Sequence, residues 1–278
     1  MIFLEFIKAI VLGIVEGITE WLPVSSTGHM ILIDELLKLD VSGEFLEMFL
    51  VVIQLGAILA VPTLFFGKLN PFSSRKSQEE KRETLSLWGK VIVGAIPAAI
   101  LGVLLDDIFD KYLYNYITVA ITLVGYGVLF IVIEKMNANK SYRVERVEDL
   151  SYTDALKIGA FQVLSLIPGT SRSGSTILGG MLTGVSRTAS AEFSFFMAIP
   201  IMLGASGLKI LKFLLGGFSA TGTEIALLLT GIVVSYIVSL VVIKFLMDFV
   251  KRHSFSPFGV YRIVLGAVVI AYFLIKLA

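Results

Sequence analysis

Long apolar runs alternate with short polar stretches along this chain, and six of the runs contain few charged residues. A bilayer core about 30 Å thick is crossed by roughly 20 helical residues at a rise of about 1.5 Å each. Runs of this length therefore predict membrane-spanning helices. The six predicted spans are approximately 45–66, 87–105, 113–133, 190–213, 224–247 and 258–277.

Two further apolar segments are interrupted by polar residues and a proline. The first, roughly 3–37, has a polar turn after Pro23, and the second, roughly 154–185, has one after Pro168. A proline-centred break frees backbone groups that hydrocarbon cannot satisfy, so neither segment can lie in lipid as one uniform helix. Each segment is predicted to form a helix, a turn at the membrane midplane and a second helix.

The composition agrees with a membrane protein, because 56% of the 278 residues are hydrophobic, 16% are charged and the mean hydropathy is +0.88. A soluble domain carries about 25% charged residues. The net charge of +1 provides no basic excess for binding nucleic acid, so we expect no nucleic-acid partner. The chain has no cysteine, which excludes thiolate nucleophiles and thiolate metal sites.

The two interrupted segments resemble one another in sequence. A shift of 146 residues aligns Glu16 with Gln162 and Ser25 with Ser171. A shift of 148 residues aligns the Leu-Gly-Ala sequences of the spans that follow. Two matching blocks at nearly the same shift and in the same order indicate that half of the chain is a copy of the other half.

The repeat predicts a single membrane domain with two related halves. The first half is residues 1–135, the second is 154–278, and 136–153 form a connecting cytoplasmic loop. Each half would contain one re-entrant helix pair and three spans, so the second half would enter the membrane inverted. The predicted fold class is therefore an all-α integral membrane protein with six transmembrane helices and two re-entrant pairs in an inverted-topology repeat.

Positive charges indicate the orientation of the chain. The loops at 67–86, 135–153, 185–189 and 248–257 would share one side of the membrane. That side holds most of the Lys and Arg residues: Lys68, Arg75, Lys76, Lys81, Arg82, Lys135, Lys140, Arg143, Arg146, Arg187, Lys251 and Arg252. The opposite side has Lys38, Lys111 and Lys276. The positive-inside rule makes the first side cytoplasmic, so both termini should face outward.

Two glutamates lie within the first interrupted segment. An ionisable side chain at membrane depth is costly, and its default interpretation is functional. Glu16 and Glu20 are four residues apart and share one helix face, so together with phosphate oxygens they could hold a divalent ion. The alternative is a structural pair that is neutralised by protonation or by Arg172.

The second turn, residues 168–176, contains Arg172 among five Ser and Thr residues. The free N–H groups of a helix start, an arginine fork and several hydroxyls together describe a site for a phosphate or a carboxylate. Alternatively, the hydroxyls only bond to helix carbonyls. For any single hydroxyl, such as Ser173 or Ser175, both interpretations stay open.

The first turn offers a second capped helix start, so two positive helix ends could face one anion of more than one charge. Ser26 and His29 lie three residues apart on the helix that follows, where they could act as nucleophile and base. The alternative for His29 is an ordinary buried hydrogen-bonding group. The other histidine, His253, lies in a basic turn and is given no role, and the charged run at 75–83 is predicted to be a solvated loop or a short surface helix.

These motifs together resemble the membrane undecaprenyl-diphosphate phosphatases associated with bacitracin resistance. The resemblance covers essentially the whole chain. It is carried by Glu16-Gly17-Ile18-Thr19-Glu20, Leu22-Pro23-Val24-Ser25-Ser26-Thr27-Gly28-His29, Gln54-Leu55-Gly56, Pro168-Gly169-Thr170-Ser171-Arg172-Ser173-Gly174, Ser194-Phe195 and Tyr261-Arg262.

The resemblance implies that a C55 isoprenoid diphosphate is hydrolysed to its monophosphate, which recycles the lipid carrier of bacterial cell-wall precursors. It also implies re-entrant helix pairs, an inverted repeat, a site open to the outside of the plasma membrane, and a divalent ion, Mg²⁺ or Ca²⁺, handled by Glu16 and Glu20. Ser26 would be the nucleophile, His29 its proton-transfer partner and Arg172 a diphosphate ligand. The full set assigned to diphosphate binding is Ser25, Thr27, Ser171, Arg172, Ser173 and Thr176.

An inverted repeat with broken helices is above all a transporter architecture. A secondary transporter of an organic anion, or a lipid flippase, is therefore the alternative function. The adjacent Ser26 and His29 favour the phosphatase, because transport does not require a nucleophile. The expected partners are the isoprenoid diphosphate and membrane lipids, and the sequence leaves a homodimer open.

Overall fold

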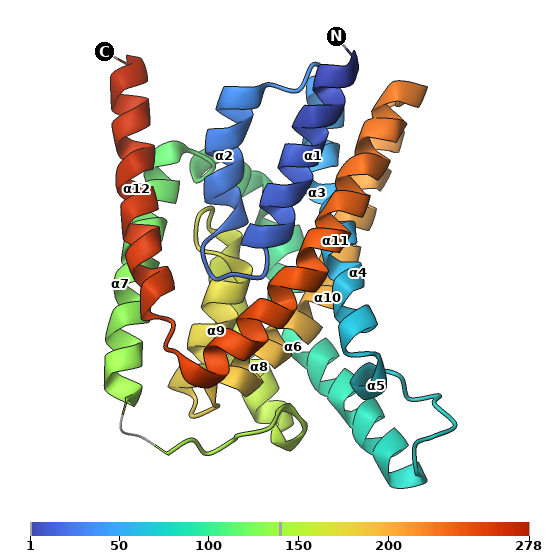
Figure 1. Ribbon diagram of the computed structural model, residues 1–278, viewed down its shortest axis with the longest axis vertical. Coiled ribbons are helices and arrows are strands. Elements are labelled where there is room, and N and C mark those ends of the chain that lie inside the picture. Colours follow the sequence, from blue (N-terminus) through green and yellow to red (C-terminus); the bar gives the residue numbers. More distant parts are fainter. Residues whose placement is uncertain (1, 139–140, 278) are drawn as a thin grey trace.

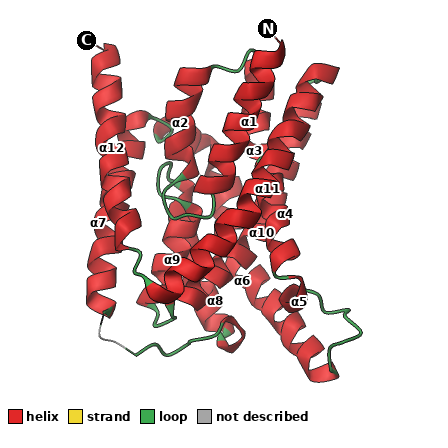
Figure 2. Cartoon of the chain, in the orientation of Figure 1, coloured by secondary structure: helices red, strands yellow, loops and turns green. Residues whose placement is uncertain are grey.

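The computed structural model describes residues 2–138 and 141–277, and the regular structure of this part is helical (Figure 2). Lys140 of the predicted connecting loop lies outside the described residues. The α-helices are α1 (Ile2–Thr19), α2 (Ser26–Leu37), α3 (Gly43–Val52), α4 (Gln54–Leu64), α5 (Phe66–Leu69), α6 (Gln78–Tyr112), α7 (Tyr116–Asn137), α8 (Tyr152–Val163), α9 (Arg172–Leu182), α10 (Arg187–Leu215), α11 (Gly222–Arg252) and α12 (Ser256–Leu277). Two 3-10 turns, η1 (Val147–Asp149) and η2 (Leu164–Leu166), precede and follow α8.

Six segments among the described residues are long and apolar enough to cross a membrane, which confirms the six predicted spans. They are Gly43–Leu64, Gln78–Leu105, Tyr116–Asn137, Arg187–Leu215, Gly222–Arg252 and Ser256–Lys276. The first consists of α3 and α4, which follow one another with only Ile53 between them. The chain is therefore an all-α, multi-pass membrane protein.

At 75–83, where a solvated loop or a short surface helix was predicted, the residues from Gln78 onward are helical and mostly exposed, but the helix is not a short separate one. Residues from Gln78 onward form the first turns of α6. Ser77 is the N-cap, since its hydroxyl accepts the Glu80 N–H at 3.2 Å and the Glu80 carboxylate accepts the Ser77 N–H at 2.6 Å. This reciprocal pair is a capping box, which starts a helix regardless of the charge density of its first turn.

Both interrupted segments form helical hairpins, as predicted. In Figure 1, α1 and α2 extend inward from the end of the molecule that carries both termini. The α8 and α9 pair extends from the opposite end, where the connection between α7 and α8 lies, and the two interhelical turns meet in the central region. The polar residues of both turns are thereby brought together inside the helix bundle.

Close helix contacts interleave the two predicted halves. Helix α1 packs along α11, and α8 packs along α6, so each hairpin lies against a span from the other half. Two glycines make these contacts close: a Cβ at Gly13 would lie 2.8 Å from the carbonyl oxygen of Gly231, and one at Gly159 would lie 2.1 Å from that of Gly94. Small residues at such positions let membrane helices approach through their backbones.

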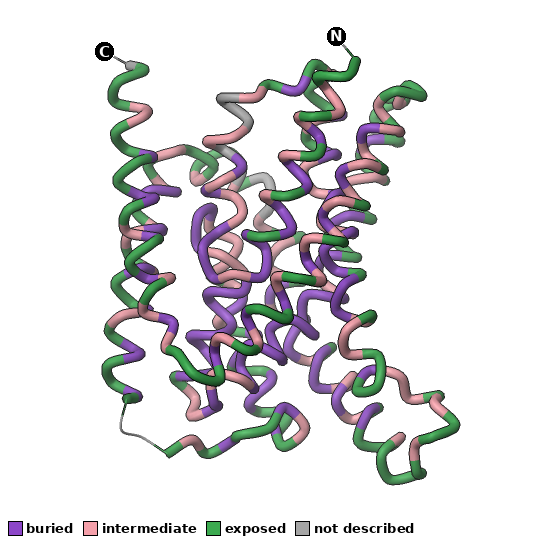
Figure 3. The backbone as a smooth tube through the Cα atoms, in the orientation of Figure 1, coloured by how far each residue is buried: buried purple, intermediate pink, exposed green. Residues whose placement is uncertain are grey.

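Burial increases from the outside of the bundle towards the two turns (Figure 3). The outer faces of the spans expose large apolar side chains such as Ile121, Val241 and Val264, which is the surface expected in lipid. Ion pairs hold the end of the molecule opposite the termini: the Arg187 guanidinium donates to Glu134 at 2.5 to 2.9 Å, and Glu134 also accepts the N–H of Phe255. These bonds join α7, α10 and the start of α12.

Candidate active site

The two turns have the same capped conformation at positions 146 residues apart. Ser25 has φ of 74° and Ser171 has φ of 73°. The Ser25 hydroxyl accepts the N–H of Gly28 at 3.2 Å, and the Ser171 hydroxyl accepts that of Gly174 at 3.1 Å. A positive φ costs a residue with a side chain about 1–3 kcal/mol, and the cap offsets about 1 kcal/mol of this. The sharp turns bring the starts of α2 and α9 to the middle of the bundle.

Arg172, the first residue of α9, links the two turns. Its Nη2 donates to Glu20 Oε1 at 2.8 Å, and its Nη1 donates to the carbonyl oxygen of Ser194 at 2.8 Å and to the Ser194 hydroxyl at 3.2 Å. The guanidinium also lies 5.7 Å from the ring centroid of Trp21. The side chains of Arg172 and Glu20 are only 11% and 8% exposed. Because water screens such a pair weakly, the two charges interact strongly.

Glu20 also binds the predicted nucleophile. The Ser26 hydroxyl donates to Glu20 Oε2 at 3.1 Å, so this carboxylate divides its two oxygens between the serine and the guanidinium. His29 has other partners, since its Nδ1 lies 2.8 Å from the carbonyl oxygen of Ser25 and its Nε2 lies 2.6 Å from the hydroxyl of Tyr261. The role of His29 as a base for Ser26 stays a prediction, and the acceptor next to Ser26 in this conformation is Glu20.

Ser171 and Ser173 extend the contact between the turns. Their hydroxyls lie 3.2 Å apart, and the Ser173 hydroxyl reaches the carbonyl oxygens of Glu20 and Leu22 at 3.2 and 3.4 Å. The side chain of Ser173 therefore bonds to the first hairpin rather than to its own helix. The arrangement fixes the separation of the two helix starts.

Ser175 and Thr176 follow the alternative interpretation, in which hydroxyls bond to helix carbonyls. Their side chains donate to the carbonyl oxygen of Arg172 at 3.1 and 2.9 Å. Thr176 is fully buried, and its hydroxyl also lies 2.7 Å from that of Ser194, which in turn accepts from Arg172. Thr176 thus contacts the Arg172 side chain indirectly, through the Ser194 hydroxyl that both side chains bind.

Glu16 is a buried charged group beside this cluster. It is 1% exposed, and its Oε1 has no hydrogen-bond partner among the described residues. The charges that act on it are those of Glu20 and Arg172. The described part of the chain holds no group of three or more His, Asp or Glu side chains that could ligate a metal alone. The unpartnered oxygen fits a hard divalent ion that takes its other ligands from water and phosphate, as Mg²⁺ commonly does.

Comparison with known proteins identifies the family to which this chain belongs. The family model described as bacitracin resistance protein BacA matches residues 9–268. The chain belongs to the BacA family. One relative, named undecaprenyl-diphosphatase, from Enterococcus faecalis, is 56% identical over 274 residues that cover 99% of each chain. A protein of the same name from Acetivibrio thermocellus is 58% identical over 271 residues and 98% of each chain, and undecaprenyl-diphosphatase 1 of Clostridioides difficile is 57% identical over 270 residues and 97% of each.

Arg262 lies within the apolar span α12 of this BacA-family chain, and the sequence motifs assigned it no role. The side chain is completely buried, and it donates to the backbone carbonyls of Pro23 at 3.2 Å, Gly169 at 2.8 Å and Thr170 at 3.0 Å. One arginine therefore holds both turns. The signal was available, because the rule that singled out Arg172, an ionisable residue at membrane depth, applies equally to Arg262.

Two cavities of the BacA-family chain lie next to one another, and the smaller one is lined by residues of both hairpins. The smaller, about 150 Å³, is lined by Thr27 of the first turn, Pro168 of the second and Tyr114 of the α6–α7 connection. The larger, about 490 Å³, lies between α3 and α10 and also has Tyr114 in its lining, with Lys209 and Lys212 among the polar residues. The shared tyrosine makes the two cavities neighbours.

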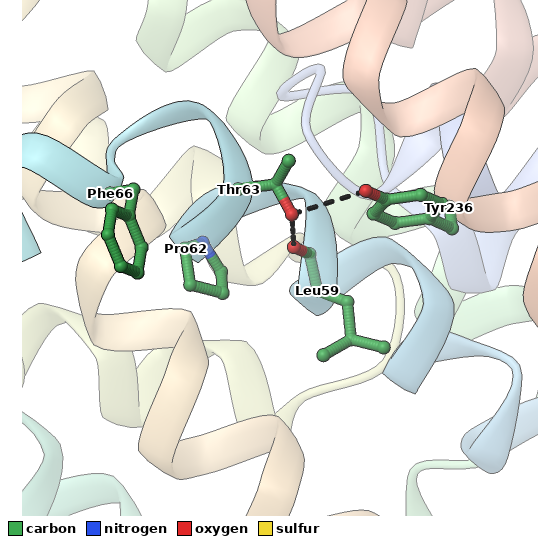
Figure 4. Close-up of a pocket in the computed structure, with 5 residues that line it drawn as sticks. All are labelled: Leu59, Pro62, Thr63, Phe66 and Tyr236. Carbon is green, nitrogen blue, oxygen red and sulfur yellow. Dashed lines mark hydrogen bonds between the residues drawn. The ribbon is translucent and has the colours of Figure 1, made fainter.

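A third cavity, about 360 Å³, lies apart from the residues of the site. Figure 4 shows its lining, in which Thr63 of α4 points towards Tyr236 of α11; the lining residues are Leu59, Pro62, Thr63, Phe66 and Tyr236. The Thr63 hydroxyl donates to the Leu59 carbonyl at 2.8 Å and lies 3.2 Å from the Tyr236 hydroxyl. None of the predicted site residues lines this cavity, and it holds no charged group, so it is not a site for a diphosphate.

Proposed function

We propose that this chain hydrolyses undecaprenyl diphosphate to undecaprenyl phosphate and inorganic phosphate. The observation that carries the proposal is the cluster in which Arg172, Glu20 and Ser26 meet across two helix starts. Family membership and relatives named undecaprenyl-diphosphatase support the substrate. The reaction would return the lipid carrier to cell-wall synthesis.

Arg172 would bind the diphosphate by exchanging one anion for another. Without substrate its Nη2 is neutralised by Glu20, while Nη1 stays fixed to Ser194. A phosphate that approaches the guanidinium would compete with Glu20 for it. The phosphate would also accept hydrogen bonds from the backbone N–H groups at the starts of α2 and α9. Negative charge that builds up on the transferred phosphoryl group would be stabilised by the same donors.

This exchange would also prepare Glu20 as a proton acceptor. A carboxylate that loses its arginine partner binds a proton more readily. Ser26 already donates to Glu20, so we assign Ser26 as the nucleophile and Glu20 as the group that takes its proton. The oxygen of Ser26 would attack the terminal phosphorus, the isoprenyl monophosphate would leave, and water would then release inorganic phosphate.

A divalent ion, Mg²⁺ or Ca²⁺, would be held by Glu16 with help from Glu20. The buried, unpartnered oxygen of Glu16 supports this assignment. When bound, such an ion neutralises phosphate charge and polarises the phosphoryl oxygens. Glu16 itself would supply the ion with a carboxylate ligand from α1.

The orientation follows from the loop charges. We propose that the end of the molecule opposite the termini faces the cytoplasm of a bacterial cell, and that both termini and the opening of the site face outward across the plasma membrane. Arginine and lysine residues of the connecting segments at that end, such as Arg143, Arg146 and Lys251, support this orientation. The hairpins would then be re-entrant from opposite sides, and the isoprenoid tail would remain in lipid while its headgroup reaches the turns.

The test is phosphate release from a C55 or shorter isoprenyl diphosphate by the purified protein in detergent. We expect release that a chelator abolishes, that returns with Mg²⁺ or Ca²⁺, and that Glu20→Gln abolishes while the protein stays folded. Glu79→Gln, which changes an exposed glutamate in the first turn of α6, is the matched control and should keep wild-type release. Folded wild type that releases no phosphate with any of several divalent ions would refute the phosphatase, and counterflow of labelled substrate would then establish the transporter.

A further inference from the structure

The partners of His29 determine which of its nitrogens carries the hydrogen. Nδ1 lies 2.8 Å from the carbonyl oxygen of Ser25, and a carbonyl oxygen only accepts, so Nδ1 is the donor in this bond. In the neutral ring Nε2 must then be an acceptor. The hydroxyl of Tyr261, 2.6 Å away, is therefore the donor to Nε2.

Tyr261 is held beside His29 by more than this bond. The two rings stack with centroids 5.6 Å apart and planes inclined by 6°. The next residue, Arg262, is completely buried and bonded to backbone carbonyls of both turns, which fixes α12 relative to the site. Tyr261 itself is 47% exposed, whereas Ser25 is buried. Nδ1 therefore points towards the protein interior, and Nε2 and the tyrosine hydroxyl lie on the open side.

Removal of the Ser26 hydroxyl proton does not require His29. The Ser26 hydroxyl donates to Glu20, which approaches from the residues before the turn. The hydrolysis proposed above has a second proton requirement, because the oxygen that leaves with the isoprenyl monophosphate gains the electron pair of the broken P–O bond. A positioned acid that protonates such an oxygen contributes about 10²- to 10⁴-fold to a rate.

We propose that Tyr261 is the proton-relay partner of His29, carrying a proton from Nε2 to the departing isoprenyl phosphate. The inference rests on the proposed phosphatase function. Before this step Nε2 binds a proton from water on its exposed side, which makes the ring an imidazolium and reverses the bond, so that Nε2 donates to the Tyr261 oxygen. In the step the Nε2–H bond breaks and its proton bonds to the Tyr261 oxygen, while the original hydroxyl proton of Tyr261 bonds to the leaving oxygen. The P–O bond breaks with its electron pair on that oxygen. His29 ends neutral, Tyr261 ends as a neutral phenol, and the leaving phosphate has gained one proton.

The kinetic test is Tyr261→Phe, which keeps the stacked ring and removes the hydroxyl. We expect kcat to fall by about 10- to 100-fold with KM changed less than about twofold, since the loss concerns proton transfer. Tyr272→Phe, on the same helix and away from both turns, is the matched control and should keep wild-type kcat. In a His29→Ala background Tyr261→Phe should cause no further loss. Wild-type kcat in Tyr261→Phe, or independent losses from the two substitutions, would overturn the relay while wild-type phosphate release still upholds the phosphatase.

A second test observes the bond directly. The chain has only two histidines, so His253→Gln leaves His29 as the single source of imidazole ¹⁵N signals. We expect a protonated Nδ1 and an Nε2 signal displaced from that of a free acceptor by the tyrosine bond. Tyr261→Phe should move the Nε2 signal to the free value and leave Nδ1 in place. A purely packing role would leave both signals unchanged, and that result, or a protonated Nε2 in the neutral ring, would contradict the proposal.

Discussion

Replacing Arg172 by lysine keeps the positive charge and removes the two-pronged donor. Arg172 bonds to Ser194 through Nη1 and to Glu20 through Nη2, and a lysine ammonium is a compact point charge that cannot hold both directions. A hydrogen bond to a charged partner contributes about 1.5–3 kcal/mol. If the Nη2 group that binds Glu20 also binds the phosphate, Arg172→Lys should lower kcat/KM by about 10- to 160-fold.

Arg172→Ala should have a second, separable effect on stability. It leaves Glu20 buried without its counter-charge, and breaking a buried pair in this way costs about 3–5 kcal/mol. The double variant Arg172→Ala/Glu20→Gln should recover much of that stability, because the uncompensated charge is gone, but it should recover no activity. The alanine variant alone should be both inactive and less stable.

The assay measures phosphate release and the unfolding temperature in the same detergent for each variant. Arg252→Ala removes an exposed arginine at the end of α11 and serves as the control. Wild-type kcat/KM in Arg172→Lys would show that the Nη2 group of Arg172 does not bind the substrate. A double variant as unstable as Arg172→Ala would show that the stability loss does not come from the stranded charge of Glu20.

Three further predictions concern packing, the buried arginine and an ion pair. Gly56→Ala would place a Cβ 2.0 Å from a backbone oxygen of α11 and should destabilise the fold by about 1–3 kcal/mol, whereas Gly204→Ala meets nothing within 4 Å and should leave the unfolding temperature unchanged or raise it. Arg262→Met should lower both the unfolding temperature and kcat/KM, because each buried carbonyl that loses its donor costs about 1–3 kcal/mol; unchanged values would show that the turns hold together without it. Burial raises the pKa of Glu148, but the bond from Lys68 at 2.9 Å, a backbone hydrogen bond and the charges of Lys68 and Arg146 together outweigh this and place the pKa below the usual 4.5. The pair should therefore stabilise the fold above about pH 4.5 and lose this effect as the pH falls through the pKa of Glu148 in the folded protein. In Glu148→Gln the unfolding temperature should depend less on pH below about pH 4.5 than in the wild type. Equal slopes of unfolding temperature against pH in both proteins would contradict the assignment.

The helices were largely predictable because their signals are local. Apolar runs of membrane length and proline-centred breaks gave all six spans and both hairpins, and each span differs from its prediction only near its ends. The span containing α6 was predicted to begin at residue 87 because its apolar length defined it, whereas the helix begins at Gln78, after the capping box of Ser77 and Glu80. The predicted duplication into halves stays a prediction, and the matching turns at Ser25 and Ser171 agree with it.

The partners within the site were less predictable because they depend on tertiary contact. Arg172 and Glu20 were each singled out as charges at membrane depth, but 152 residues separate them, and no spacing rule gives their bond. Ser26 was matched with His29 from helix periodicity, whereas its partner lies six residues earlier. The left-handed backbone at Ser25 folds the chain back on itself, and a helical pattern cannot express that reversal.

The bonds made by Arg262 have a consequence for the order in which the site forms during synthesis. A membrane chain is inserted from its N-terminus, so both hairpins are made before α12, which begins at Ser256, emerges. Until then the carbonyls of Pro23 and Gly169 lack the donor that joins the two turns in the finished protein. The nascent chain therefore holds its two turns together through direct contacts between the hairpins, such as those of Arg172 and Ser173 with Glu20, and insertion of its last helix adds a further link through Arg262.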